Sequence, residues 1–195
     1  MKTAKKLDLY RERAADYVAP RKPVFVTVAP ARYLAIDGRG APGGPEFSAA
    51  IGALYGMAFT IKMARKAAGR DYAVCKLEGL WTKWEPPAVP DWTLLIRTPD
   101  FIEAADLREA AEQIAKKGKG AEVGRVKLRT LKEGRCVQML HVGPYDQVGA
   151  TIEVMLEQAR AEGLKQRDHL HEVYLSDPRR VAPARLRTIV RMPVG

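Results

Sequence analysis

Apolar residues recur along the chain with two different spacings, which predict helices and strands. Apolar stripes at a spacing of three or four residues predict helices at residues 46–68, 101–117 and 145–162. Runs rich in aromatic and β-branched residues predict strands at residues 24–36, 72–80, 92–98, 123–131, 136–142, 169–175 and 186–192. The first of these runs is one strand or a pair of short strands, because Pro30 interrupts it. A short surface helix is expected at residues 7–17.

The predicted elements occur twice in the same order. A strand–helix–strand–strand unit at residues 22–99 is followed by a linking helix at residues 100–119, and the same unit returns at residues 120–195. The matched positions are Gly40 with Gly143, Asp71 with Asp168, and Arg97 with Arg191. We therefore expect one domain over residues 22–195, built from two repeats and preceded by a charged N-terminal segment at residues 1–21.

Two such repeats predict an α+β fold with pseudo-twofold symmetry. Their strands would form an antiparallel sheet of about eight strands, with the helices on one face and a ligand cleft on the other. Junctions between related halves are favoured ligand sites.

Composition places the chain among ordinary globular proteins. It has 195 residues, of which 47% are hydrophobic and 29% are charged. The first twenty residues lack the apolar centre of a signal peptide, and no apolar run approaches the ~18 residues of a membrane span, so we expect a cytoplasmic protein. Cys75 and Cys136 have no metal-binding spacing and are expected to be reduced core thiols, and neither a metal nor a cofactor is predicted.

The net charge of +10 raises the question of nucleic-acid binding. The basic residues form short groups that lie far apart in the sequence, and no nucleic-acid-binding motif accompanies them. A solvated basic surface is the better interpretation, so nucleic acid is not an expected partner.

Glu172 is the most informative residue, because it lies in the middle of a predicted strand. The two-residue period of a strand puts Glu172 and Tyr174 on one face, and His171 and Val173 on the other. If the sheet is covered on both sides, this carboxylate must be paired, protonated or facing a cavity. The alternative is an edge strand on which Glu172 points to water.

The internal repeat extends this prediction to the first half. If Asp71 matches Asp168, then Cys75 matches Glu172 and Leu77 matches Tyr174. One half would then supply the acid, and the other an apolar wall that ends at Trp81. Glu78 falls on the opposite face of its strand, unless a bulge at Gly79 turns it inward.

Several motifs resemble one family over nearly the whole chain. They are Asp71-Tyr72-Ala73-Val74, Leu77-Glu78-Gly79-Leu80-Trp81, Pro99-Asp100-Phe101-Ile102, Gly143-Pro144-Tyr145-Asp146, and His171-Glu172-Val173-Tyr174-Leu175-Ser176-Asp177-Pro178-Arg179. This set resembles the GyrI-like small-molecule-binding domains, which are related to the effector-binding domains of multidrug-responsive regulators. It is most similar to the stand-alone subgroup, some of whose members hydrolyse cyclopropane-bearing alkylating natural products of the yatakemycin and duocarmycin type.

The resemblance implies a ligand cleft with a central glutamate, which maps onto Glu172. Aromatic walls would map onto Trp81, Trp84, and Tyr145 or Tyr174. The subgroup commonly has adjacent tryptophans after the Leu-Glu-Gly-Leu run, whereas here Thr82 follows Trp81. This departure leaves the shape of the pocket, and so the substrate, open.

The remaining candidates have ordinary structural interpretations beside their functional ones. Trp84 and Tyr145 are ligand walls or turn-packing residues, and Tyr55 is a wall residue or part of the helix core. His141 is a ligand-binding residue or a satisfied core histidine, and His171 is expected to be satisfied within the core.

The functional prediction has three branches. In the first branch, the chain binds flat aromatic or amphipathic small molecules, cations among them. As an enzyme it would hydrolyse cyclopropane-bearing compounds for detoxification. Glu172 would be the general base, and Tyr174 or Tyr145 the proton donor. The alternatives are a non-catalytic drug-binding or sensor protein, and a gyrase-interacting inhibitor. The sequence leaves turnover and oligomeric state open, with a homodimer among the assemblies considered.

Overall fold

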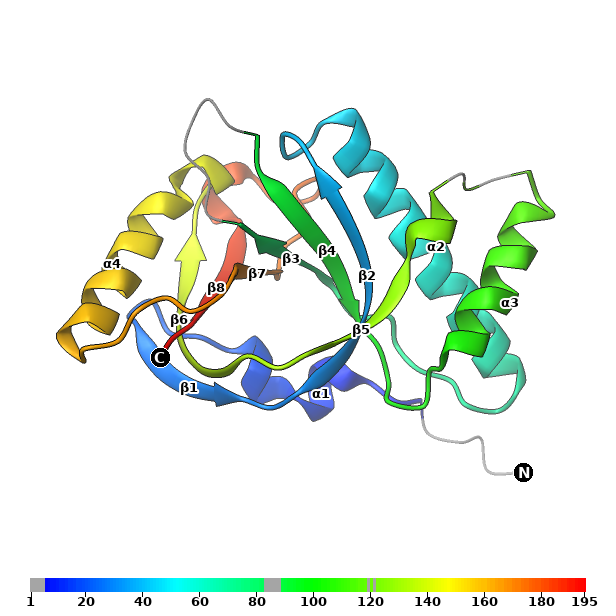
Figure 1. The fold of residues 1–195 in the computed structure, drawn as a ribbon, viewed down its shortest axis with the longest axis horizontal. Coiled ribbons are helices and arrows are strands. Elements are labelled where there is room, and N and C mark those ends of the chain that lie inside the picture. The colour runs from blue at the N-terminus through cyan, green and yellow to red at the C-terminus, as the bar shows by residue number, and fades with distance from the viewer. Residues whose placement is uncertain (1–5, 83–88, 119, 121) are drawn as a thin grey trace.

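The computed structural model describes residues 6–82, 89–118, 120 and 122–195, and it has the predicted α+β fold (Figure 1). The helices are α1 (Leu9–Glu12), α2 (Pro45–Ala67), α3 (Ala104–Ala115) and α4 (Val148–Ala161). The strands are β1 (Val24–Val28), β2 (Ala31–Arg39), β3 (Leu77–Trp81), β4 (Asp91–Arg97), β5 (Lys127–Leu131), β6 (Gly134–Val142), β7 (Leu170–Tyr174) and β8 (Arg187–Pro193). Together the strands form one antiparallel sheet with the order β1-β6-β8-β7-β3-β4-β2-β5.

The two repeats are related by pseudo-twofold symmetry about the central pair β3–β7. Each half consists of a long strand, a helix and two further strands. Counted from either edge of the sheet, equivalent strands of the two repeats occur in the same order. The first strand of each repeat lies in the other half, because β1 pairs with β6 and β5 pairs with β2. The sequence did not predict this exchange of edge strands.

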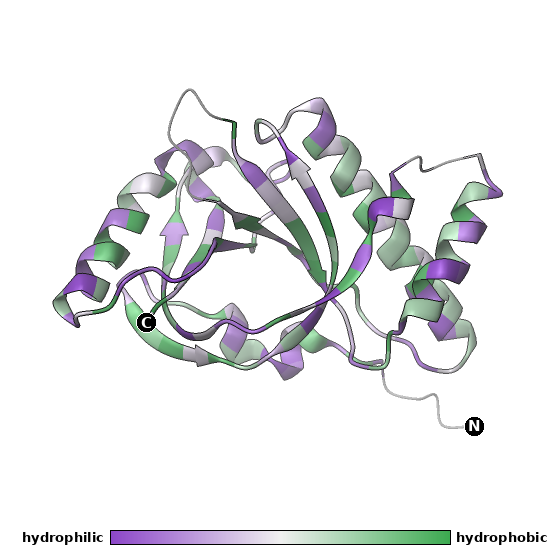
Figure 2. Ribbon diagram, in the orientation of Figure 1, coloured by the Kyte–Doolittle hydropathy of each residue, from purple (hydrophilic) through white to green (hydrophobic). Residues whose placement is uncertain are grey.

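Both long helices pack on the same face of the sheet. α2 packs on β2 and β4, α4 packs on β6 and β8, and α3 packs on α2 (Figure 1). Figure 2 shows hydrophobic and hydrophilic residues alternating along these helices, which is the pattern of helices with one buried side. Strands β3 and β7 therefore lie between the two helices.

The long helix α2 has clear sequence signals at both ends. Pro45 occupies its first turn, where the absent N–H costs nothing, and Arg65 and Lys66 lie in the last turn, where they favour the helix dipole. Among the described residues, α2 is the one helix long and apolar enough to cross a membrane by those two measures. In this fold it is a core helix, because Leu54, Met57 and other side chains are buried against the sheet.

The face of the sheet away from the helices is filled by protein. The sheet curls, and the N-terminal segment packs against this face, where Tyr17 contacts Leu140, Val173 and Ile189. The backbone of the N-terminal segment is also hydrogen-bonded to β6, since the Leu140 N–H donates to the Pro20 carbonyl. The expected arrangement placed a ligand cleft on this face, whereas the described residues there are packed together.

The alignment of the repeats differs from the predicted one. Residues 73–76 precede β3 and pair with no strand, so Cys75 is not a strand residue. Leu77 pairs with Ile96, and Glu172 pairs with Val190. When the two repeats are aligned on Arg97 and Arg191, Ile96 occupies the position of Val190. The partner of Ile96 is then equivalent to the partner of Val190, so the counterpart of Glu172 is Leu77 and not Cys75. The alignment that matched Asp71 with Asp168 was wrong within the strands, because the segment that leads into β3 differs in length from the one that leads into β7.

Candidate functional site

Glu172 lies at the centre of the sheet, on the face that carries the helices. In the strand register it stands between Gly79 and Val190, and Gly79 stands beside Leu94. Val190 packs with the cluster under α4, and Leu94 packs with the cluster under α2. We call the helix-facing side of the two central strands the central strip; its residues are Leu77, Gly79, Trp81, Leu170, Glu172 and Tyr174.

The prediction that Glu172 and Tyr174 share one face, opposite His171 and Val173, is confirmed. Glu172 is only 7% exposed although it carries a carboxylate, and it is not on an edge strand. The alternative that Glu172 points to water from an edge strand is therefore wrong.

Tyr174 and Trp81 form a hydrogen-bonded pair beside Glu172. The indole Nε1–H of Trp81 donates to the Tyr174 hydroxyl oxygen over 3.1 Å, which joins the two halves of the sheet. Gly79 lies beneath this pair. A Cβ atom at this position would be 3.0 Å from the Tyr174 hydroxyl oxygen and 3.1 Å from Trp81 Nε1. The pair can sit there because residue 79 has no side chain.

The surroundings of Glu172 favour its protonated form. Burial raises the pKa of Glu172, while hydrogen bonding from Tyr174 and Trp81 and the charge on His171 oppose the rise. Burial likewise raises the pKa of Tyr174, and the charge of Glu172 adds to this effect. A carboxyl group with a raised pKa beside a phenol that keeps its proton is suited to acid–base chemistry.

Tyr145 reaches the same place from the short 3-10 turn at residues 145–147, which leads into α4. Its ring meets that of Tyr174 edge to face, with the centroids 5.6 Å apart, and it is 38% exposed. Burial, followed by the charge of Glu172, raises the pKa of Tyr145. The structure therefore brings Glu172, Tyr174, Tyr145 and Trp81 together.

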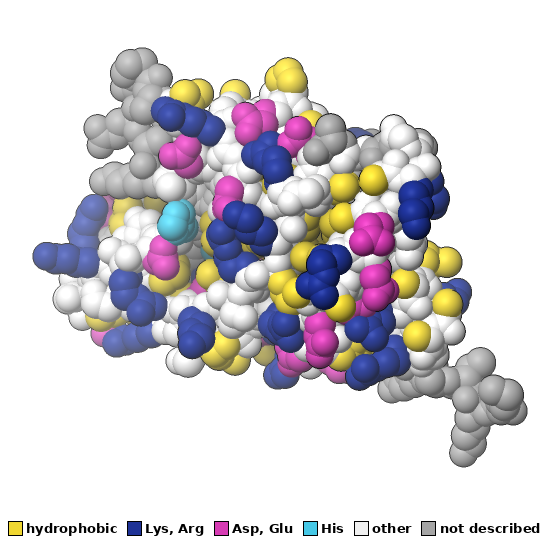
Figure 3. Space-filling view, turned by 45° about the vertical axis from the view of Figure 1, so that its right-hand side comes forward, with side chains coloured by type: hydrophobic (Ala, Val, Ile, Leu, Met, Phe, Trp, Pro, Cys, Tyr) yellow, Lys and Arg dark blue, Asp and Glu magenta, His cyan; other side chains and the backbone are white. Residues whose placement is uncertain are grey.

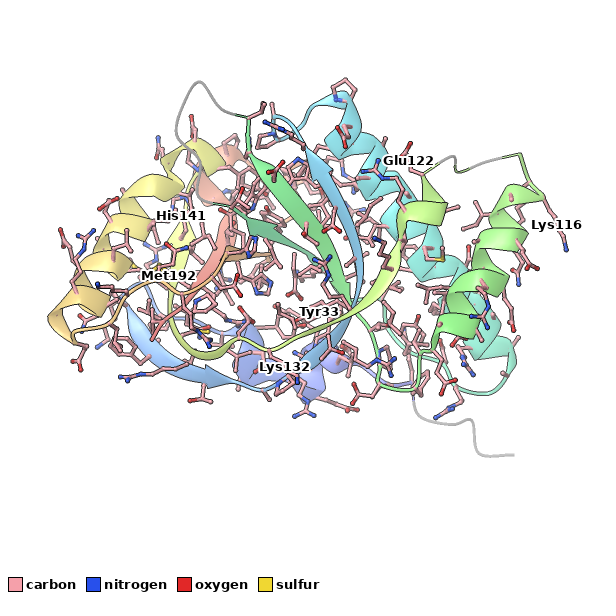
Figure 4. All side chains as sticks on the ribbon, viewed as in Figure 1. Tyr33, Lys116, Glu122, Lys132, His141 and Met192 are labelled. Carbon is pink, nitrogen blue, oxygen red and sulfur yellow. The ribbon has the colours of Figure 1, made fainter. Side chains whose placement is uncertain are left out.

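His141 anchors the loop that carries Tyr145. Its Nδ1 lies 2.9 Å from the Thr151 hydroxyl oxygen on α4, and its Nε2 lies 3.1 Å from the Pro144 carbonyl oxygen. Figure 4 shows His141 on β6, next to α4. Because a carbonyl can only accept, Nε2 carries the hydrogen. These contacts give His141 a structural role in the loop.

Helix α2 lines the side of the central strip with aromatic residues. Phe47 stacks on Trp81 with ring centroids 5.9 Å apart. Tyr55 lies two turns further along the helix and stacks on Phe59, which is 53% exposed. Leu77 is half-buried within the cluster under α2.

Two predicted residues lie elsewhere, and one lies outside the described residues. Cys75 is buried in the cluster under α2, where burial raises its pKa to about 12. Glu78 stays on the face away from the helices, and no bulge at Gly79 turns it inward. Trp84 falls in residues 83–88, which lie outside the described part of the chain.

Glu78 belongs to a group of charged residues on that face, all buried except the half-buried Asp16. We call it the interior charge network: Asp16, Glu78, Arg97, Glu133, His171 and Arg191. His171 is fully buried, with Nε2 2.9 Å from Glu78 and Nδ1 2.9 Å from Glu133. Arg191 Nη1 donates to Glu133 over 3.1 Å. Arg97 donates to the Asp16 carboxylate over 2.7 Å, and Arg191 donates to the Asp16 carbonyl over the same distance.

Opposite charges balance within this network. Burial acts to lower the pKa of His171, but Glu133 and Glu78 outweigh it and raise the pKa to about 9. Burial acts to raise the pKa of Glu133, but His171 and Arg191 lower it to about 2. The prediction that His171 is satisfied within the core is confirmed.

Sequence reasoning missed Gly79 and Glu133. Gly79 was considered as a bulge, but the register is regular there and its importance is steric. Glu133 falls between the predicted strands at residues 123–131 and 136–142, and nothing local in Lys132-Glu133-Gly134 indicates that it points inward. The repeat of Arg97 and Arg191 was the one available signal, because a buried arginine requires a carboxylate.

Two hollows lie outside the central strip. One of about 550 Å³ lies between α2 and α3 and is lined on the α2 side by small residues, including Gly52 and Gly56. The other, of about 370 Å³, is lined by residues that include Asp37, Trp92 and His169. No group of three or more His, Cys, Asp and Glu side chains in the described part of the chain could hold a metal. Figure 3 shows Lys and Arg side chains interleaved with Asp and Glu over the visible face.

Comparison with known proteins agrees with this fold. A family model described as the GyrI-like small molecule binding domain matches residues 100–194. An uncharacterized conserved protein from Listeria innocua is 36% identical, with a TM-score of 0.91, and the match covers 97% of this chain and 100% of that one. A hydrolase from the same organism is 36% identical, with a TM-score of 0.89 and coverage of 98% and 100%.

More distant matches carry less information. The C-terminal domain of EcmrR is 14% identical over 89% of this chain and 97% of that chain, with a TM-score of 0.60, which shows a shared fold. A search of curated proteins finds no match. The fold, the family model and the full-length similarity to the two Listeria proteins together show that this chain belongs to the GyrI-like small-molecule-binding domain family.

Proposed function

We propose that the chain binds a flat aromatic small molecule over the central strip and hydrolyses a strained, electrophilic ring in it, such as an activated cyclopropane. The observation that carries this proposal is the buried Glu172 carboxyl beside two phenols and an indole. Burying a carboxyl group costs free energy, and groups of this kind are common at functional sites. A similar protein from Listeria innocua, 36% identical over its whole length, is a hydrolase, which supports the reaction class.

Aromatic side chains support a flat ligand. Trp81, Tyr174 and Tyr145 surround Glu172, and Phe47 backs Trp81 from α2. Large rings that are already held by neighbouring rings lose little entropy when a ligand stacks on them. A cationic ligand would gain further from the ring faces and, when Glu172 is ionised, from its carboxylate.

The proposed reaction adds one water molecule across a carbon–carbon bond of the cyclopropane. Glu172 accepts a proton from water while the water oxygen bonds to the ring methylene. The ring bond breaks, and its electron pair moves to the conjugated carbonyl group. Tyr174 or Tyr145 donates a proton to that oxygen, and solvent restores the phenol and the carboxylate. Both tyrosines carry the proton that a donor needs, because burial and the charge of Glu172 raise their pKa values.

The test is incubation with a duocarmycin-type cyclopropane compound, followed by mass spectrometry for the water adduct. Glu172→Gln keeps the shape of the side chain and removes the base, so turnover should fall ~10²–10⁴-fold. Binding, followed by tryptophan fluorescence, should change little. Glu153→Gln makes the same chemical change at an exposed position on α4 and should leave the rate unaltered.

The outcomes separate the candidate functions. Equal rates for wild type and Glu172→Gln would remove the general base from the mechanism. Tight binding without any water adduct would leave a drug-binding or sensor protein that uses the same residues. A gyrase inhibitor would act through its outer surface, and an unchanged supercoiling rate at micromolar protein would remove that branch.

A further inference from the structure

We propose that Gly79 is a positioning residue: its missing side chain lets the Trp81 indole N–H reach the Tyr174 hydroxyl, and this contact turns the hydroxyl hydrogen toward Glu172. This inference rests on the proposed function for its consequence in catalysis. The contact itself can be tested without any substrate.

The backbone does not require glycine at position 79. Several glycines in this chain adopt a positive φ that other residues rarely adopt, but Gly79 is not among them. It lies in a regular ladder, opposite Glu172 on β7 and Leu94 on β4. Glycine weakens a strand interior, so a glycine there commonly marks close approach by another group. Here the approaching groups are the Tyr174 hydroxyl and Trp81 Nε1, both about 3 Å from a Cβ at this position.

The chemistry of the indole fixes the direction of the hydrogen bond. An indole N–H can only donate, so the Tyr174 oxygen is the acceptor over their 3.1 Å contact. The hydroxyl hydrogen of Tyr174 must then point elsewhere. Glu172 lies on the same strand face two residues away, so we infer that its carboxyl group accepts this hydrogen.

This arrangement orders three groups in a chain from Trp81 through Tyr174 to Glu172. Hydrogen bonds in such a chain polarise one another, so donation from Trp81 makes the Tyr174 hydroxyl a stronger donor. In the proposed reaction, the contact would hold the Tyr174 phenol beside the general base, which leaves Tyr145 to donate the proton to the substrate oxygen. A Cβ at position 79 would press on both the Tyr174 hydroxyl and Trp81 Nε1, so both groups must shift to make room for it. We expect this shift to weaken their hydrogen bond.

The direct test uses the indole N–H signals of the three tryptophans in a proton–nitrogen NMR spectrum. Trp81→Phe identifies the Trp81 signal by its loss. In Tyr174→Phe and in Gly79→Ala, that signal should move upfield and exchange faster with water, because its acceptor is removed or displaced. Trp92 donates to the Gly40 carbonyl over 3.2 Å, so its signal should stay protected from exchange with water in every folded variant and is the internal reference for exchange.

The activity test is a double-mutant cycle on the proposed reaction. Gly79→Ala and Tyr174→Phe should each lower turnover by about three- to tenfold, the effect of one hydrogen bond. The double variant should be no slower than Tyr174→Phe alone, because the added methyl group acts through the hydroxyl that is already missing. Gly52→Ala is the matched control, since nothing lies within 4 Å of a Cβ at that position.

An unmoved Trp81 signal in folded Gly79→Ala protein would overturn the steric role of Gly79. If Gly79→Ala does not fold, Tyr174→Phe still decides whether Trp81 donates to this hydroxyl, and an unmoved signal there would overturn the inference. Additive effects in the cycle would show that Gly79 acts independently of Tyr174. A wild-type protein without turnover would contradict the proposed function, while the NMR result would still judge the positioning role.

Discussion

Glu172 and His171 are neighbours on β7 but face opposite sides of the sheet. His171 lies between Glu78 and Glu133, whose charges favour its cationic form. Glu172 has no comparable cation on its own face among the described contacts, and burial raises its pKa. One residue therefore stabilises the fold through its charge, and the other is destabilising when ionised.

Glu172→Gln should therefore make the protein more stable at neutral pH. Because the folded-state pKa of Glu172 lies above its ordinary value of 4.5, its protonated form favours the folded state, and this contribution is lost as pH rises through the raised pKa. A gain of about 1 kcal/mol would raise the midpoint of thermal unfolding by roughly 2–4 °C. Calorimetry at pH 7 and pH 4 checks this, since the difference between the unfolding midpoints of wild type and Glu172→Gln should be smaller at pH 4. A lower midpoint at pH 7 would contradict the interpretation.

The ion pairs of His171 with Glu78 and Glu133 predict a second loss of stability at higher pH. Its pKa is raised from 6.5 to about 9, so its contribution is complete below pH 6.5 and is lost as pH rises through 9. The free energy of unfolding should fall across this window by up to about 3 kcal/mol. Urea unfolding at half-unit pH steps measures it. His171→Gln should flatten the curve and destabilise the protein by about 3–5 kcal/mol, because the carboxylates lose their cation. A wild-type curve that is already flat would show that His171 is neutral in the fold.

At the scale of single elements, the period of a strand predicted more than the spacing of the repeat. Alternation along β7 correctly separated Glu172 and Tyr174 from His171, because that pattern depends on local geometry alone. Matching Asp71 to Asp168 failed, because the connection before β3 is longer than its counterpart. Strand register depends on partners distant in the chain, which residue spacing cannot report.

The same distinction explains the missed site residues. Trp81 and Tyr174 were candidates from their type, but their hydrogen bond joins strands from different repeats. Gly79 matters because of that contact, and so its role cannot be read from local sequence. Glu133 follows β5 and precedes β6, and only the pairing of β6 with β8 places it beside Arg191.

At the scale of the whole molecule, the exchanged edge strands join the two halves. β1 belongs to the first repeat but completes the sheet of the second, and β5 does the reverse. Asp16 adds to this link, since it binds the symmetry-related pair Arg97 and Arg191. Neither repeat has a complete sheet of its own.

Separate halves should therefore fail to fold. A fragment of residues 100–195 lacks β1 and leaves β5 without β2, so it should show little cooperative unfolding by circular dichroism. Mixing it with residues 1–99 should restore the sheet and a cooperative transition. A cooperative transition in the isolated C-terminal fragment would contradict this prediction.

The counterpart of Glu172 across the pseudo-twofold axis is Leu77, and this difference has a consequence for how a ligand is oriented. The backbone around the axis is nearly the same when turned end for end, but only one side carries an acid. A molecule lying across the axis would contact the carboxyl group of Glu172 at one end and the apolar side chain of Leu77 at the other. A ligand with two unlike ends would thus have a head and a tail in the site, and only one of its two directions would place the reactive carbon beside the acid.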